Sequence, residues 1–336
     1  IYIGGGARVS VQSMTNTPSS DSERTLSQVL ELEKAGCDIV RIAVSNDAEV
    51  EACKKIIGKP KAALVADIQF DYRMAVKCAD IGFDKIRFNP GNIGDESKVK
   101  EVVAACKRNR VPIRVGVNGG SLDKSISAYA GGAEALAQSA LKHASILEKY
   151  GFYDTVLSVK SSDVRTMAEA YEILDARCDY PLHLGVTESG TKTRGIIKSA
   201  IGIGSLLLKG IGDTIRVSLT GDPVREVEAA KLILSALNLN GDCVEIVSCP
   251  TCSRCNYDME PIVDELEKKL SGLKKRLKIA IMGCVVNGPG EAADADIALC
   301  GGKNGKAALY VKGKVTKTVD VSDAVSEILA LTEKMS

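Results

Sequence analysis

Eight short β-rich runs alternate with amphipathic helical segments over the first 240 residues of the chain. The runs cover residues 9–14, 39–44, 63–68, 85–88, 113–117, 155–159, 182–186 and 214–219. Apolar residues between them recur at helical spacing, and the last helix has a start signal, with Asp222 as N-cap and Pro223 at the first helical position. This number and length of strand–helix pairs predicts a (β/α)8 TIM barrel, with a doubly wound open α/β sheet as the alternative.

The chain departs from this repeat after residue 240. A strand-like run at 244–247, a helical stretch at 262–270 and an apolar strand at 278–282 predict a smaller α+β domain. The 336 residues are enough for both parts, so we predict a barrel domain at 1–240 and a second domain at 241–336.

Charge and hydropathy exclude two classes of partner. The formal net charge is +1, which argues against nucleic-acid binding, because such proteins normally carry a basic excess. No apolar run is long enough to span a bilayer, and the residues after Ile1 do not form a secretory signal, so we expect a cytoplasmic protein. Because the chain opens on Ile1 rather than Met, we also expect some N-terminal residues to be missing.

Charged and polar side chains follow several of the predicted strands. The active site of a TIM barrel lies at the C-terminal ends of its strands, and period-two alternation turns one set of side chains inward while residues such as Ile86 and Phe88 face the helices. The polar set, expected near the strand ends, is Arg41, Arg87, Asn89, Arg114, Asn118, Lys160, Arg216 and Ser218, and Glu188 follows the seventh run.

A single arginine of this kind is usually a surface ion-pair partner, but five cations from five strands favour a ligand. Guanidinium groups match phosphate oxygens, so the predicted ligand is a small molecule with several phosphate oxygens. Neither a P-loop nor a dinucleotide-binding glycine motif is present in the sequence, so ATP and NAD are not predicted.

Five of the eleven cysteines lie between residues 249 and 300, and the odd total argues against a disulfide framework. Cys249 and Cys252 form a CxxC pair, and Cys284 follows on a distant glycine-rich turn. A four-cysteine zinc site would normally be more compact, and a thioredoxin-like CxxC needs no distant thiol, so an iron–sulfur cluster is favoured. On spacing alone, Cys255 would complete an all-cysteine site.

Five motifs resemble those of the 4-hydroxy-3-methylbut-2-enyl diphosphate synthase family, in its short bacterial form. They are QSMTNT (12–17), RFNPGN (87–92), LHLGVTE (182–188), SCPTC (248–252) and GCVVNGPGE (283–291). They are long and occur in the family's order over nearly the whole chain. The resemblance implies a TIM barrel followed by a [4Fe–4S] domain, and an enzyme of the methylerythritol phosphate route to isoprenoids.

The implied reaction is the two-electron reductive ring opening and dehydroxylation of 2-C-methyl-D-erythritol 2,4-cyclodiphosphate, with ferredoxin or flavodoxin as the electron donor. The resemblance further implies a homodimer. It assigns Cys249, Cys252, Cys284 and Glu291 as cluster ligands, Glu188 as a proton-handling acid, and the polar strand residues named above as diphosphate ligands. The alternative is an iron–sulfur electron-transfer or sensing protein whose barrel is not catalytic.

Two positions depart from the family pattern. Gln69 stands where the family commonly has His, and its amide cannot supply a proton near pH 7. Cys255 is a thiol that the family usually lacks, and if Glu291 is the fourth ligand it is free. A carboxylate ligand exchanges more readily than a thiolate, which suits an iron that must bind substrate, so we expect Glu291 rather than Cys255.

Overall fold

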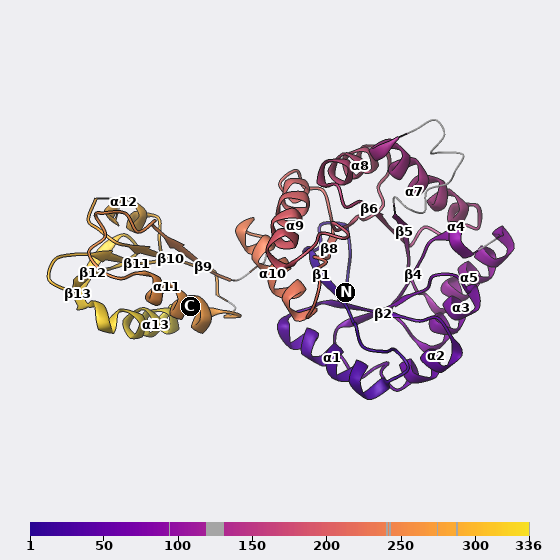
Figure 1. Ribbon diagram of the computed structural model, residues 1–336, viewed down its shortest axis with the longest axis horizontal. Helices are drawn as coiled ribbons and strands as arrows, with labels where there is room; N and C mark the ends of the chain where they lie inside the picture. The colour runs from indigo at the N-terminus through magenta and orange to yellow at the C-terminus, as the bar shows by residue number, and fades with distance from the viewer. Residues whose placement is uncertain are drawn as a thin grey trace. The chain divides into compact units, whose positions relative to one another are not determined.

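The β-rich runs of the N-terminal unit form eight parallel strands. The computed structural model describes residues 1–93, 95–118, 131–239, 241, 243–273, 275–286 and 288–335, and the chain divides into the units Ile1–Leu239 and Asn240–Ser336 (Figure 1). The strands of the first unit are β1 (Ser10–Met14), β2 (Ile39–Ala43), β3 (Ala63–Asp67), β4 (Lys85–Phe88), β5 (Ile113–Asn118), β6 (Thr155–Lys160), β7 (His183–Leu184) and β8 (Thr214–Ile215).

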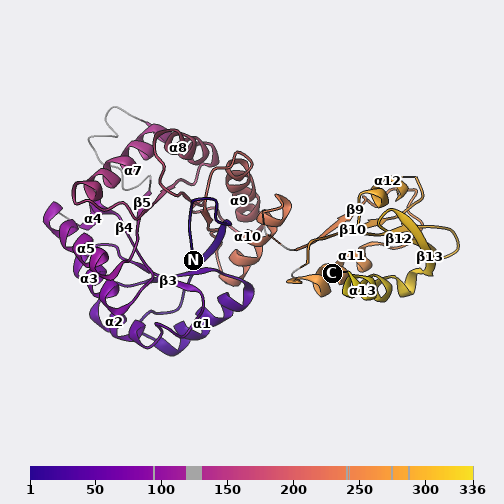
Figure 2. The ribbon, with the colours of Figure 1, turned by 180° about the vertical axis from the view of Figure 1, so that it is seen from behind.

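These strands close into a barrel. Their order is β6-β5-β4-β3-β2-β1-β8-β7, and a parallel bridge between Leu157 and Leu182 joins β6 to the residue that precedes β7. The ring of strands surrounded by helices is visible from both sides (Figures 1 and 2). The prediction of a TIM barrel is therefore confirmed, and the open-sheet alternative is wrong.

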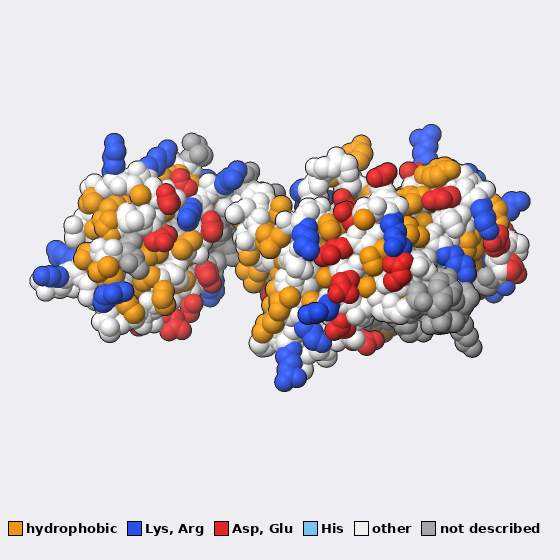
Figure 3. All heavy atoms as spheres, turned by 90° about the horizontal axis from the view of Figure 1, so that it is seen from above, with side chains coloured by type: hydrophobic (Ala, Val, Ile, Leu, Met, Phe, Trp, Pro, Cys, Tyr) orange, Lys and Arg blue, Asp and Glu red, His pale blue; other side chains and the backbone are white. Residues whose placement is uncertain are grey.

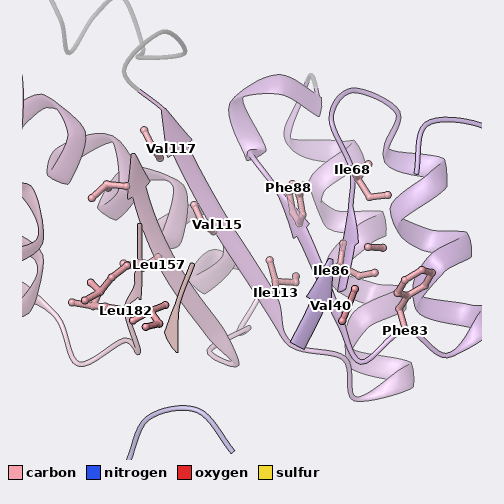
Figure 4. Close-up of a cluster of buried hydrophobic side chains, with 14 of the residues drawn as sticks. Val40, Ile68, Phe83, Ile86, Phe88, Ile113, Val115, Val117, Leu157 and Leu182 are labelled. Atoms are coloured by element: carbon pink, nitrogen blue, oxygen red, sulfur yellow. The ribbon is translucent and has the colours of Figure 1, made fainter. Parts of the chain in front are cut away.

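Helices cover the outside of the ring. They are α1 (Ser22–Ala35), α2 (Asp47–Lys54), α3 (Tyr72–Ile81), α4 (Pro90–Ile93), α5 (Glu96–Asn109), α7 (Gly132–Lys149), α8 (Val164–Arg177), α9 (Lys192–Leu207) and α10 (Val224–Ala236). Several begin at an Asp or Asn whose side chain accepts a backbone N–H of the first turn, as Asp21 does for α1 and Asn46 for α2. The outward faces of the strands supply the apolar core, which includes Ile86 and Ile113 (Figure 4). The inward faces are thereby left for polar residues.

Two local details differ from the sequence-based expectations. Strands β7 and β8 have only two residues each. The two backbones come very close just beyond them, since a Cβ at Gly185 would lie 2.8 Å from the carbonyl oxygen of Arg216. Helix α10 begins at Val224, with Pro223 rather than Asp222 at the N-cap, although the Asp222 carboxylate still accepts the Val224 N–H at 2.9 Å.

The C-terminal unit is a five-stranded sheet in the order β13-β12-β11-β10-β9. Its strands are β9 (Val244–Ser248), β10 (Leu277–Met282), β11 (Ile297–Gly301), β12 (Lys306–Val311) and β13 (Lys314–Asp320), and its α-helices are α11 (Glu260–Leu270), α12 (Gly288–Ala293) and α13 (Ala324–Lys334). Leu266 of α11 and Ile328 of α13 belong to one apolar cluster, whereas Ala292 of α12 packs in another with Ala280 and Cys300. The prediction of an α+β unit is confirmed.

Strands β9, β10 and β11 are parallel, so their C-terminal ends meet at one edge of the sheet. Cys249 and Cys284 both follow strand ends at this edge. None of the described helices is long and apolar enough to cross a bilayer. On the face shown in Figure 3, acidic and basic side chains are interspersed, as expected for a formal net charge of +1.

Candidate functional site

A buried carboxylate on β3 gathers two of the predicted arginines inside the barrel. Arg87 of β4 donates from Nη1 to Asp67 Oδ1 at 2.9 Å, and Arg41 Nε of β2 lies 3.6 Å from Asp67 Oδ2. Burial alone would raise the pKa of Asp67, but the positive charges of the neighbouring arginines together lower it to about 2. Asp67 is therefore ionised and fixes one side of a cationic site.

Removing that charge should destabilise the barrel in a pH-dependent way. The folded-state pKa of Asp67, about 2, lies below its ordinary value of 3.8, so its contribution is present above pH 4 and is lost as the pH falls through 2. We expect Asp67→Asn to lower the free energy of unfolding by about 2 kcal/mol at neutral pH. Urea unfolding of the wild-type protein and Asp67→Asn at pH 7 and at pH 3 checks this. If the difference in unfolding free energy between them were larger at pH 3 than at pH 7, the prediction would be contradicted.

Arg114 lies deeper than the sequence predicts. It is the second residue of β5 and only 1% exposed, and it pairs in register with Arg87. The expectation that every cation lies near the C-terminal end of its strand is wrong here, because β5 continues for four residues beyond the level of Arg87. Its Nη1 donates to Gln12 Oε1 at 2.9 Å, whereas Nε and Nη2 have no hydrogen-bond partner among the described residues. Burial, followed by repulsion from other arginines, lowers its pKa.

Gly116 makes room for Arg87. A Cβ at this position of β5 would lie 2.7 Å from both Nε and Nη2 of Arg87. The guanidinium group therefore lies against the bare backbone of β5, where any side chain at residue 116 would displace it.

A second carboxylate holds Arg216, which follows β8. Glu226 of α10 is buried, and its Oε1 lies 3.3 Å from Arg216 Nη2. The same carboxylate accepts the Leu219 N–H at 3.0 Å and the Ser13 hydroxyl at 2.8 Å. Glu226 was missed in the sequence, where it resembles an ordinary acidic residue in the first turn of a helix.

Met14 of β1 was also missed as a site residue. Its sulfur accepts from Arg41 Nε at 3.1 Å and Nη2 at 2.9 Å, and Arg216 Nη1 lies 3.9 Å away. Met14 belongs to the run QSMTNT, but nothing in that run distinguishes it from an apolar residue of an alternating strand. Thioether contacts to two guanidinium groups link the Asp67 side of the site to the Glu226 side.

The remaining predicted residues lie at or near the same ends of the strands. Asn89 is buried just after β4, and its Oδ1 accepts the Gly91 N–H at 3.1 Å. Lys160 ends β6 half-buried, Asn118 ends β5 exposed, and Ser218 is half-buried after β8. Arg41, Arg87 and Arg114 interact with the buried carboxylate Asp67, and Arg216 pairs with the buried carboxylate Glu226. Lys160 lies close enough to these four arginines for their charges to act on it.

Glu188 lies exposed on the loop after β7 with a backbone φ of 49°. Side chains other than glycine rarely adopt this left-handed conformation, and such strain clusters at functional sites. His183 is buried inside β7 with its Nδ1 3.4 Å from Thr214 Oγ1, and burial lowers its pKa. Gln69 is exposed just beyond β3.

The C-terminal unit brings several thiols to one edge of its sheet. Ile281 pairs with Ser248 and Met282 pairs with Cys300, so Cys249 and Cys300 flank Met282. The Gly283 N–H donates to Cys249 Sγ at 3.2 Å across 34 residues of sequence. A Cβ at Gly283 would come within 2.4 Å of the sulfur of Cys255, so this turn is closely packed by sulfur.

The two remaining predicted ligands are exposed. Cys252 lies on the loop after β9, where the backbone N–H of Arg254, together with its positive charge, lowers the pKa of the thiol. Glu291 lies in the first turn of α12, which follows Cys284. In the part of the chain that the structure describes, no three His, Cys, Asp or Glu side chains are grouped closely enough to hold a metal ion.

The donor chemistry of this edge nevertheless fits an iron–sulfur group. Thiolates are the ligands of such clusters, and backbone N–H groups directed at their sulfur atoms tune them, as the Gly283 N–H directed at Cys249 would do. Gly288 adds a further close approach, since a Cβ there would lie 2.7 Å from Cys300 Sγ.

Comparison with protein families matches both units in order. Residues 1–231 match the GcpE TIM-barrel domain, and residues 245–334 match the GcpE protein C-terminal domain. The chain belongs to the GcpE family. Its first 231 residues thus form the barrel of a GcpE protein, and the sheet that carries Cys249 and Cys284 forms its C-terminal domain.

Relatives of this GcpE chain are similar over almost their whole length. The 4-hydroxy-3-methylbut-2-en-1-yl diphosphate synthase (flavodoxin) of Clostridium perfringens is 53% identical over 335 residues, which cover 99% of this chain and 96% of that protein. The synthase of the same name from Caldanaerobacter subterraneus is 52% identical over 335 residues, which cover 99% of this chain and 94% of that protein.

Among solved structures, the dihydropteroate synthases of Stenotrophomonas maltophilia and Yersinia pestis are similar to the barrel. Each has a TM-score of 0.52, with 16% and 15% identity. They cover 68% and 69% of this chain and 93% and 94% of their own. At this identity the likeness concerns the fold alone.

Proposed function

We propose that this GcpE protein catalyses the reductive ring opening and dehydroxylation of 2-C-methyl-D-erythritol 2,4-cyclodiphosphate to 4-hydroxy-3-methylbut-2-enyl diphosphate. Flavodoxin, which the names of the relatives give, is the proposed electron donor, with ferredoxin as the other candidate. The observation that carries the proposal is the cationic interior of the barrel. Five cations interact there with one another and with only two of the described carboxylates, and such an excess of positive charge favours an anionic ligand.

The cyclic diphosphate is bound, in this proposal, by Arg41, Arg87, Asn89, Arg114, Asn118, Lys160, Arg216 and Ser218. Arg114 contributes most to the preference for an anionic ligand over a neutral one. Its Nε and Nη2 are buried and lack a partner among the described residues until an anion supplies one. Asp67 and Glu226 fix the guanidinium groups before the ligand arrives, so little side-chain freedom is lost on binding.

The C-terminal unit holds the redox group. We propose Cys249, Cys252, Cys284 and Glu291 as ligands of a [4Fe–4S] cluster. When bound, the cluster supplies the electrons and a Lewis-acidic iron. The chain contributes the Gly283 N–H, which stabilises charge on the Cys249 sulfur. It also contributes the backbone N–H of Arg254 and, to a lesser extent, the charge of that residue, which favour the thiolate of Cys252.

The choice of Glu291 over Cys255 has local support. Cys255 is half-buried, and its sulfur lies 3.1 Å from the Tyr257 carbonyl oxygen while packing against Gly283. Glu291 is exposed, and its carboxylate would hold an iron more exchangeably than a thiolate would.

Glu188 handles a proton of the reaction in this proposal. Its exposed carboxyl lies on a strained loop beyond β7, at the end of the barrel where TIM-barrel active sites form. Exposure to water lets the group exchange its proton with solvent between turnovers.

The function is tested first at the anion site. We expect Arg114→Ala to raise the KM for the cyclodiphosphate at least tenfold, because a charge-assisted contact to the ligand is lost. The visible absorption of the reconstituted cluster should stay unchanged. Arg110→Ala, at the exposed C-cap of α5, is the matched control. Unchanged KM and kcat in Arg114→Ala would remove this residue from the site.

A second candidate function, an iron–sulfur electron-transfer or sensing protein with a non-catalytic barrel, makes a different prediction. Such a protein would take up electrons without consuming the cyclodiphosphate. The buried cations of the barrel interior disfavour it. Buried guanidinium donors without a hydrogen-bond partner in the described part of the chain, as on Arg114, cost stability, and a barrel that binds no ligand gains nothing in return.

We also propose that the protein is a cytoplasmic homodimer. Helix α9 exposes Ile197 and Ile201, and Leu208 follows directly after it. Positions 197, 201 and 208 share one helix face, and an apolar stripe of this kind is typical of an interface.

The stripe gives a direct test of the dimer. We expect Ile201→Glu to convert the dimer into a monomer, because a charge would be buried in the apolar contact. Light scattering coupled to size exclusion measures the mass. Lys198→Glu, which places the same new carboxylate on α9 outside the stripe, is the control and should remain a dimer. A dimer that persists in Ile201→Glu would place the interface elsewhere.

A further inference from the structure

Met14 occupies an unusual position between two arginines. Strand β1 lies between β2 and β8 in the barrel, and Met14 pairs in register with Arg41. Its sulfur accepts from Arg41 Nε and Nη2 at 3.1 and 2.9 Å, with Arg216 Nη1 3.9 Å away on the other side. Met14 is half-buried, so the contact lies where a ligand can reach it.

A thioether is a surprising partner for two positive charges. It is neutral and a weak hydrogen-bond acceptor, whereas guanidinium groups normally pair with carboxylates or phosphates. Both arginines do have a carboxylate, Asp67 for Arg41 at 3.6 Å and Glu226 for Arg216 at 3.3 Å. The donors directed at Met14 are therefore held in place by an acceptor that an anionic oxygen readily replaces.

The two guanidinium groups carry like charges, although each also has its own carboxylate partner. They repel one another, and burial together with this repulsion lowers the pKa of Arg41 to about 9. The polarisable sulfur between them accepts from both, so it gives the two guanidinium groups a shared neutral partner.

We propose that Met14 is a positioning residue: its thioether holds Arg41 and Arg216 as a two-guanidinium clamp for one phosphate group and gives way to the oxygens of that group. The inference rests on the proposed function, since it assigns a role in binding the diphosphate. It predicts that ligand binding breaks the sulfur contacts while Asp67 and Glu226 keep theirs.

The first measurement follows the contact itself. The chain has six methionines, so labelling their methyl groups with carbon-13 gives a small set of NMR signals, and Met14→Leu identifies the one from Met14. In the full-length, anaerobically reconstituted protein, we expect inorganic diphosphate to shift the Met14 signal and to leave that of Met167, which is buried on α8, in place. A Met14 signal that does not move on saturation would overturn the inference.

The second measurement separates positioning from packing. Leucine nearly conserves the volume of methionine, so Met14→Leu should leave the melting temperature close to that of the control Met167→Leu. We expect Met14→Leu to weaken diphosphate binding about five-fold in calorimetry, the scale of one modest hydrogen bond. Met14→Gln, whose amide oxygen is a stronger acceptor that competes with the ligand, should weaken it further.

The outcomes distinguish the two proposals. Wild-type protein that binds no diphosphate would overturn the proposed function and the role of Met14 with it. If the wild-type protein binds diphosphate and Met14→Leu, Met14→Gln and Met167→Leu all bind it with the same affinity as the wild type, only the role of Met14 is overturned.

Discussion

Glu291→Ala is expected to lose most turnover and to retain about three iron atoms per chain after anaerobic reconstitution, rather than about four. The reason is that Glu291, on the turn that follows Cys284, is the proposed ligand of the iron that must also bind substrate. Iron analysis and electron paramagnetic resonance of the reconstituted protein measure the cluster, and the assay with a chemical reductant measures turnover.

Cys255→Ser is the matched control for this experiment. The sulfur of Cys255 packs against Gly283 and lies 3.1 Å from the Tyr257 carbonyl oxygen. A serine hydroxyl largely preserves these contacts. We expect Cys255→Ser to keep its iron and most of its activity. If Cys255→Ser loses iron while Glu291→Ala turns over normally, the all-cysteine ligand set is correct and the assignment of Glu291 is wrong.

Glu188→Gln should slow turnover by about 100-fold or more, the usual scale for a lost acid–base group, with little change in KM. Glutamine keeps the shape and hydrogen-bonding reach of the side chain but cannot exchange a proton near pH 7. Steady-state kinetics under anaerobic conditions measure both parameters.

The backbone of Glu188 requires its own control, because its φ of 49° stores strain. Glu188→Gly relieves that strain and removes the carboxyl group together, so it should be as slow as Glu188→Gln. Near-normal kcat in either variant would assign Glu188 to the structure of the loop instead of to proton transfer.

The sequence predicts which side chains face the barrel interior, because strand alternation encodes this directly. Arg87 and Arg114 face inward while Ile86 and Ile113 join the surrounding core, as their alternation indicates. How far a residue lies from the barrel end depends instead on where its strand ends. Arg114 is level with Arg87, but β5 continues for four residues beyond it.

Contacts between distant segments could not be predicted from the sequence either, because they depend on how the elements pack together. Glu226 reaches Ser13 across 213 residues, so its role depends on how α10 packs against β1. The Gly283 N–H reaches Cys249 only because β9 and β10 are parallel neighbours. The motifs that carry the family resemblance mark the important segments, but the partners within them are set by the fold.

The proposed reaction is tested most directly by following the fate of the cyclic diphosphate. The reconstituted protein is mixed anaerobically with 2-C-methyl-D-erythritol 2,4-cyclodiphosphate and reduced flavodoxin, and phosphorus NMR monitors the ring phosphates. We expect the signals of the cyclic diphosphate to be replaced by those of an open-chain diphosphate, and Arg114→Ala to slow this conversion at low substrate concentration. Oxidation of flavodoxin with the cyclic diphosphate left intact would contradict the proposed reaction.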